Sequence, residues 1–118
     1  MTVSMESNID DIRQGIISEL RRGLVVAVVL SRLGTAQYGY TLLKDLEAAG
    51  LAVDQNTLYP LLRRLEGQGL LSSEWKVEGQ RPRRYYMRTE TGAAVLKSLG
   101  PELANQRRIM EEIDNGSR

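Results

Sequence analysis

The stretch Asp54-Gln55-Asn56-Thr57-Leu58-Tyr59-Pro60-Leu61-Leu62-Arg63-Arg64-Leu65-Glu66-Gly67 predicts the helix, at about 55–67, around which the rest of the chain is organised. Four of its leucines recur at spacings of three and four residues, the pattern of one buried helix face. Asp54 and Asn56 are good capping residues and Pro60 lacks an N–H group, so we expect the helix to begin near Asn56. The opposite face carries the polar set Gln55, Asn56, Tyr59, Arg63 and Glu66.

Two apolar segments and a shorter helix are predicted before this stretch. Residues 1–7 are expected to form a frayed tail, with Asn8 capping a helix whose apolar positions are Ile9, Ile12, Ile16 and Leu20. A more apolar helix is expected over 19–33, and the pattern leaves open whether a glycine separates the two. A short amphipathic helix is expected over 40–49, ended by Gly50.

A two-stranded hairpin is predicted after the leucine-rich helix. Apolar and polar residues alternate from Leu71 to Val77, residues 78–80 are a turn candidate, and 84–88 form the return strand. Trp75 shares a face with Leu71 and Val77, which predicts a core position for it. Tyr85 and Tyr86 are consecutive, so they should point to opposite faces of the hairpin.

A last helix is predicted to begin at Glu90, capped by Thr89. Its apolar stripe is interrupted by Gly100-Pro101, which should kink or split it because proline removes a helical hydrogen bond. A domain this small has little left to cover the stripe, which therefore favours pairing with a second chain. The stripe consists of Leu96, Leu99, Leu103, Gln106, Met110 and Ile113.

The order of these elements is that of a winged helix-turn-helix, in which a recognition helix enters the DNA major groove beside a basic hairpin. We therefore predict an α+β, mostly helical fold with additional N- and C-terminal dimerisation helices. The expected segments are an N-terminal tail or helix extending the dimer interface (1–18), a winged helix-turn-helix domain (19–89) and a C-terminal dimerisation helix (90–118).

Several motifs, in order and at suitable spacing, make the chain resemble the PadR-like transcriptional regulators over about residues 19–99. Asn56 stands where a small residue such as glycine is common in that family, and it either contacts DNA or caps the helix. The last helix is short, as in the smaller members of the family. The motifs are Leu20-Arg21-Arg22-Gly23-Leu24, Tyr38-Gly39-Tyr40, Thr57-Leu58-Tyr59-Pro60-Leu61-Leu62-Arg63-Arg64-Leu65-Glu66, Gly69-Leu70-Leu71, Trp75, Arg83-Arg84-Tyr85-Tyr86 and Thr89-Glu90-Thr91-Gly92.

The charge distribution agrees with a double-stranded DNA partner. Seven basic and three acidic side chains between residues 55 and 88 give a balance of +4, whereas the remaining residues carry −3. The basic charge thus lies on the recognition helix and the wing, at about 76–84. The candidate DNA-binding residues are Tyr38, Tyr40, Gln55, Asn56, Thr57, Tyr59, Arg63, Arg64, Lys76, Gln80, Arg81, Arg83 and Arg84.

Other interpretations of these residues stay open. The alternative for the polar helix face and for the wing is a plain solvated surface, although their place in a winged-helix layout favours DNA contact. Arg64 lies near the core edge and is compatible with a side chain that only snorkels. Tyr38 and Tyr40 either contact the DNA backbone or pack the start of their helix.

Besides the complex with DNA, we expect a homodimer, and the resemblance implies that the last and first helices hold the homodimer together. It also implies release of DNA by a small hydrophobic or aromatic effector at the dimer interface. Four apolar residues either line the effector site or form ordinary core of the dimer interface, namely Val25, Val29, Leu99 and Leu103. The candidate dimer-interface residues are Ile12, Ile16, Leu20, Val25, Leu96, Leu99, Leu103, Met110 and Ile113.

Composition excludes most catalytic chemistry. The 118 residues include no Cys and no His, so Ser-His-Asp and Cys-His sites and the usual zinc sites cannot be built. We expect no enzyme, no cofactor and no metal. No apolar run approaches the ~20 residues that span a bilayer, so we expect no membrane partner and a cytoplasmic location.

The predicted function is a dimeric repressor that binds a palindromic operator. The alternative is a winged-helix module for protein–protein contact with weak or no DNA binding.

Overall fold

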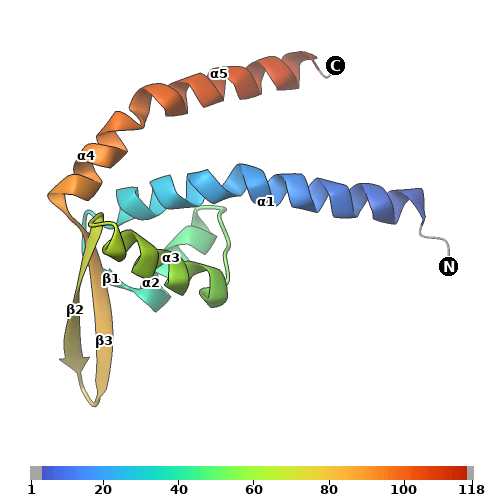
Figure 1. Cartoon of the computed structure of the whole chain (residues 1–118). Helices are drawn as coiled ribbons and strands as arrows, with labels where there is room; N and C mark the ends of the chain where they lie inside the picture. The colour runs from blue at the N-terminus through green and yellow to red at the C-terminus, as the bar shows by residue number, and fades with distance from the viewer. Residues whose placement is uncertain (1–3, 117–118) are drawn as a thin grey trace.

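The computed structural model describes residues 4–116, and residues 1–3 and 117–118 of the predicted terminal segments lie outside the described part. In this part of the chain, helices are combined with a three-stranded antiparallel sheet, whose strand order is β1-β3-β2. The elements are α1 (Met5–Arg32), β1 (Gln37–Tyr38), α2 (Gly39–Ala48), α3 (Gln55–Gly67), β2 (Leu71–Glu78), β3 (Arg81–Arg88), α4 (Glu90–Ser98) and α5 (Gly100–Gly116) (Figure 1).

The N-terminal segments form one continuous helix, α1, which runs across the predicted boundary at residue 18. The expected cap at Asn8 is wrong: Ser4 caps the helix by accepting a hydrogen bond from the backbone N–H of Ser7. Gly15 and Gly23 do not break it, because a helical glycine costs only about 1 kcal/mol relative to alanine. At 1.5 Å per residue the 28 residues of α1 span about 42 Å.

The core lies where the C-terminal half of α1 packs with α2, α3 and the base of the hairpin. Leu58, Leu62 and Leu65 of α3 are buried in it, as their spacing predicts. Asp54 caps α3, accepting a 2.8 Å hydrogen bond from the N–H of Thr57, so the helix begins at Gln55. The other buried members of the cluster are Val25, Val29, Leu30, Leu33, Leu42, Leu46, Leu51, Leu71 and Tyr86.

The hairpin forms as predicted, with longer strands and a third strand that the sequence did not indicate. A two-residue turn connects Glu78 to Arg81, and Gly79 has a φ of 65°, the positive value that a type II′ turn requires at this position. The added strand β1 pairs Gln37 with Tyr86 and Tyr38 with Tyr85. It is only two residues long, too short for an alternation pattern to reveal.

Trp75 is not a core residue, contrary to the sequence expectation. Its side chain is 66% exposed and that of Val77 is 73% exposed, whereas Leu71 on the same face is buried. The alternation correctly identifies the face, but the hairpin runs past the edge of the core, so only its base is covered (Figure 1).

The C-terminal segment is split into α4 and α5 at Gly100-Pro101, as the proline predicts. Within the described part, no residue of α5 is buried. Both α1 and α5 project from the winged-helix core (Figure 1). The radius of gyration is therefore 17.6 Å, against about 13–14 Å for a compact domain of this length.

Candidate nucleic-acid interface

The solvent-facing side of α3 is the first component of the candidate interface. Gln55, Asn56 and Arg63 are all exposed, and among the described residues no ion pair engages Arg63. Amide side chains suit adenine, and a guanidinium suits guanine or a phosphate. These three side chains are therefore free to contact a groove.

Tyr59 lies differently, on the side of α3 that meets α2. A Cβ atom added at Gly39 would lie 2.6 Å from the Tyr59 ring, so the glycine permits this close packing of the two helices. Tyr59 is only partly exposed, so it positions α2 against α3 and remains only a candidate DNA contact.

The two tyrosines at the start of α2 have separate environments. Tyr40 is 53% exposed, with the Lys44 ammonium 5.6 Å from its ring centre. Tyr38 belongs to β1 and packs edge-on against Tyr85, with ring centres 5.4 Å apart. Tyr40 is therefore the more accessible of the two for a phosphate.

One face of the wing carries a layered aromatic and cationic cluster. The Arg83 guanidinium lies 4.5 Å from the Tyr38 ring centre and the Lys76 ammonium 4.9 Å from that of Tyr85. The Tyr85 hydroxyl donates a hydrogen bond to the Glu78 carboxylate, which raises the pKa of Tyr85. Arg83 also pairs with Glu78 at 3.3 Å. The cluster holds both cations on a stiff surface.

The opposite face of the wing is tied to α3. Arg84 donates to the Glu66 carboxylate at 2.6 Å and to the Ser73 hydroxyl at 3.0 Å, and its guanidinium also lies 5.8 Å from the Trp75 ring centre. Arg84 therefore links α3 to the wing, and part of its charge is already neutralised by Glu66.

Two further basic residues of the +4 segment point away from the candidate surface. The Arg88 side chain donates a 3.1 Å hydrogen bond to the Leu30 carbonyl and so satisfies a backbone acceptor near the C-terminal end of α1. Arg64, together with Thr57, lines a pocket toward α1. The exposed cations left for DNA are Arg63, Lys76 and Arg81, with Arg83 partly exposed.

Gln80 lies beside Gly79 in the turn and is exposed at the tip of the wing. Its position suits a contact to the minor groove or to phosphates.

The candidate dimer residues divide into exposed and buried sets. Val25 belongs to the core of its own chain, with 6% of its side chain exposed, because it faces α3 rather than solvent. Leu96 packs against the same core, and Leu99 is half-buried. The exposed members are Ile12, Ile16, Leu20, Leu103, Met110 and Ile113.

The residues expected to line an effector site at the dimer interface lie in different places within one chain. Val29 is fully buried in the core, whereas Leu103 is exposed on α5. Val25 instead lines the pocket toward α3. These side chains therefore do not face a common cavity within one chain.

Residues 4–116 contain no group of His, Cys, Asp and Glu suited to a metal ion. In the same part of the chain, no helix has both the length and the apolarity needed to cross a bilayer.

Sequence reasoning missed the anionic partners of the wing, Glu66 and Glu78, and the strand residue Ser73. The two-residue turn at Gly79 sets the register of the hairpin, which places Ser73 opposite Tyr86 and Glu78 opposite Arg81. Recognition of that turn in the sequence would therefore have aligned Ser73 and Glu78 with the return strand. The contact between Glu66 and Arg84 joins elements 18 residues apart and had no local signal.

Comparisons with known proteins agree with this geometry. The family model of the PadR-like transcriptional regulators matches residues 28–98. The crystal structure of a PadR family transcriptional regulator from Eggerthella lenta is similar, with 43% identity, a TM-score of 0.83 and coverage of 91% of this chain and 96% of that one.

Two further relatives are more distant in sequence or coverage. A PadR-like transcription factor from Bacteroides fragilis is 32% identical, with a TM-score of 0.69 and coverage of 84% and 98%. The transcriptional regulator Rv3488 of Mycobacterium tuberculosis is 41% identical over 76 residues, which span 64% of each chain. These matches are to regulators and support a DNA-binding regulator rather than an enzyme. The chain belongs to the PadR-like family of transcriptional regulators.

Proposed function

We propose that this regulator is a homodimeric repressor that binds a palindromic operator, with α3 in the major groove and the wing on the adjacent backbone. The observation that carries the proposal is the exposed face of α3, with Asn56 and Arg63, next to a wing that Glu66 and Arg84 hold at a set angle. Occupation of a promoter by this surface would block transcription without any further activity of the chain.

The dimer rests on the uncovered apolar stripes of the two projecting helices. Ile12, Ile16 and Leu20 are each more than half exposed on α1, and α5 exposes Met110 and Ile113. Stripes of this size on a soluble chain mark an interaction surface, and a second copy offers a complementary one. Two-fold symmetry then predicts two half-sites about 34 Å apart, or a multiple of that distance.

In vitro selection from a random DNA pool tests the proposal directly. We expect a palindromic consensus with a fixed half-site spacing. Recovery of no consensus, together with no gel shift on bulk DNA at low salt, would favour the alternative of a protein–protein interaction module. A reporter under the selected operator should be transcribed more strongly when the regulator gene is deleted, and weaker transcription would contradict repression.

The wing assignment has its own test in the salt dependence of binding. Arg81→Ala removes an exposed cation at the tip and should make the log–log slope shallower by about 1. Lys97→Ala, on the exposed side of α4, is the matched control and should leave the slope unchanged. An equal slope for wild type and Arg81→Ala would remove this residue from the DNA contact.

A further inference from the structure

The outer half of the hairpin carries an apolar patch that the rest of the described chain leaves uncovered. Trp75, Val77 and Pro82 are all exposed there. Trp75 and Val77 are two residues apart in β2 and so point to the same face, and Pro82 lies opposite Val77 in the register of the hairpin. An exposed tryptophan within such a patch marks an interaction surface.

The patch continues the surface of α3 that carries the proposed DNA contacts. The guanidinium of Arg84, which lies opposite Trp75, is 5.8 Å from the Trp75 ring centre and 5.4 Å from that of Tyr86. Burial raises the pKa of Tyr86, and the positive charges of Arg84 and Arg63 act in the opposite direction, so the exposed Arg63 of α3 lies near this ring. One surface therefore extends from Arg63 past Arg84 to Trp75.

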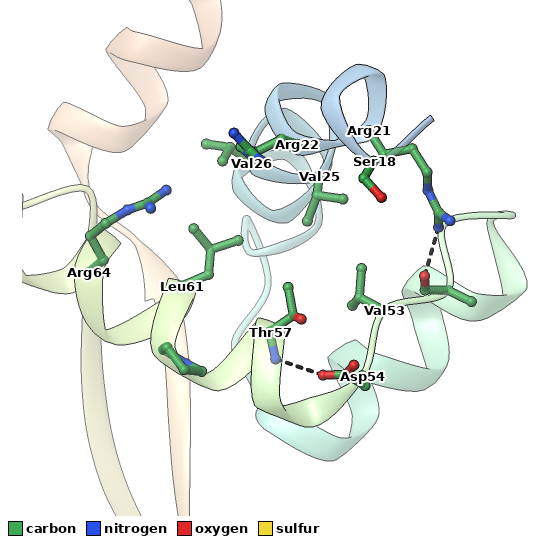
Figure 2. A pocket seen from close by; sticks show the side chains of 12 residues that line it. Ser18, Arg21, Arg22, Val25, Val26, Val53, Asp54, Thr57, Leu61 and Arg64 are labelled. Carbon is green, nitrogen blue, oxygen red and sulfur yellow. Dashed lines mark hydrogen bonds between the residues drawn. The ribbon is translucent and has the colours of Figure 1, made fainter. Parts of the chain in front are cut away.

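The neighbouring side of α3 is directed toward α1 and not toward the wing. Figure 2 shows Arg64 of α3 among the residues that line the pocket between α1 and α3. Consecutive residues of a helix point about 100° apart, so Arg63 is directed to another side. The side of α3 that carries Arg63 is therefore the one that DNA can share with the wing.

The charges of the hairpin also differ between its two faces. Its two carboxylates, Glu74 and Glu78, alternate onto the face opposite to that of Trp75. Within the hairpin, which the structure describes throughout, the Trp75 face has no carboxylate of its own. Glu66 of α3 approaches this face, but it is paired with Arg84 at 2.6 Å. A polyanion can therefore approach the Trp75 face without repulsion from a free carboxylate of the hairpin.

We propose that Trp75 and Val77 enter the DNA minor groove that flanks each half-site and select A·T base pairs there. In a minor groove, A·T pairs present only acceptors, whereas a G·C pair adds the N2 amino group of guanine. That amino group projects from the floor of the groove, where an apolar side chain clashes with it and leaves it without a hydrogen-bond partner. This contact adds a specificity determinant to the bases that α3 reads, and it rests on the proposed function.

Base analogues test the contact on the operator obtained by selection, with Kd measured by the anisotropy of labelled duplexes. Wild type should bind about tenfold more weakly when the flanking A·T pairs are changed to G·C. Replacement of those guanines by inosine, which lacks only the N2 amino group, should restore the affinity. Trp75→Ala should bind all three duplexes with similar affinity. Met87→Ala, at an exposed apolar position on the other face of the hairpin, is the matched control and should discriminate as wild type does.

The emission of Trp75 gives a second readout, because it is the single tryptophan of the chain. Binding of the selected operator should shield the indole, so that acrylamide quenches its emission less efficiently than in the free protein. Trp75→Phe keeps an aromatic ring and should recover part of the discrimination that Trp75→Ala loses. The salt dependence of binding should be the same for Trp75→Ala and wild type, because no charge is removed.

Three results would overturn the contact. Equal losses of affinity for the guanine and inosine duplexes would show that the minor-groove amino group is not sensed. Operator binding with unchanged acrylamide quenching would leave Trp75 outside the DNA interface and assign the patch to a protein partner. Failure of the protein to bind any DNA would contradict the proposed function together with this contact, whereas the first two results leave the proposed function intact.

Discussion

Gly92 illustrates how a single residue controls the junction between the wing and the C-terminal helices. A Cβ atom there would lie 2.2 Å from the Leu70 carbonyl oxygen, which belongs to the backbone and cannot move cheaply. Thr89 caps α4 at the same point by accepting from the Gly92 N–H at 3.0 Å. The motif Thr89-Glu90-Thr91-Gly92 is therefore a close-packing device as well as a helix start.

Gly92→Ala should lower the free energy of unfolding by about 1–3 kcal/mol, the range of overpacking changes. Gly15→Ala is the matched control, since nothing lies within 4 Å of its added Cβ and alanine favours the helix by about 1 kcal/mol. Urea denaturation at one protein concentration measures both. Equal stability of Gly92→Ala and wild type would show that the backbone around Leu70 accommodates the added methyl group without cost.

Tyr86 links stability to alkaline pH. Burial is the main cause that raises the pKa of Tyr86 above its ordinary value of 10.0. Above pH 10 the unfolded chain loses this proton while the folded chain keeps it, so the folded state binds more protons and stability falls as pH rises.

Tyr86→Phe should therefore lose less stability than wild type as the pH is raised from 9 to 11, measured by urea denaturation at each pH. Tyr40→Phe, at an exposed position, should follow the wild-type curve. Parallel curves for Tyr86→Phe and wild type would contradict the raised pKa of Tyr86 as a source of the pH dependence.

At the scale of elements, one ion pair links the wing to α3 in addition to the shared core at the base of the hairpin. Arg84 and Glu66 are 2.6 Å apart, with 34% and 28% of their side chains exposed. Solvent screens a pair of this exposure, so its coupling energy should be about 0.2–1 kcal/mol.

A double-mutant cycle with Glu66→Gln and Arg84→Gln, read by urea denaturation, measures that coupling. The exposed pair of Lys44 and Glu47 on α2, at 3.8 Å, is the comparison and should couple more weakly. A coupling for Glu66 and Arg84 no larger than that of the α2 pair would mean that other contacts set the wing angle.

At the scale of the whole molecule, the projecting helices explain the extended shape. The double variant Ile12→Asp/Ile16→Asp places charges on the exposed stripe of α1 and should convert the proposed dimer to a monomer in sedimentation, with loss of operator affinity. Gln14→Asp, about 200° around the helix from both isoleucines, is the control and should remain dimeric. A dimer that survives the double change would assign assembly to another surface.

Much of the local structure was predictable because its signals are local. The leucine spacing of α3, the caps at Asp54 and Thr89 and the break at Gly100-Pro101 each act within a few residues. Trp75 was placed wrongly for the same reason: periodicity identifies a face, but the extent of the core that meets this face depends on distant segments.

The sequence by itself determined the element order, the helix α3 and the concentration of positive charge on α3 and the wing, because helix periodicity, capping and composition are properties of neighbouring residues. Only the tertiary structure decided which of those charges are available. It engages Arg84 with Glu66 and directs Arg88 to the Leu30 carbonyl of α1. Such partners are separated by tens of residues along the chain, and packing alone brings them within the few ångströms at which charges and hydrogen bonds act.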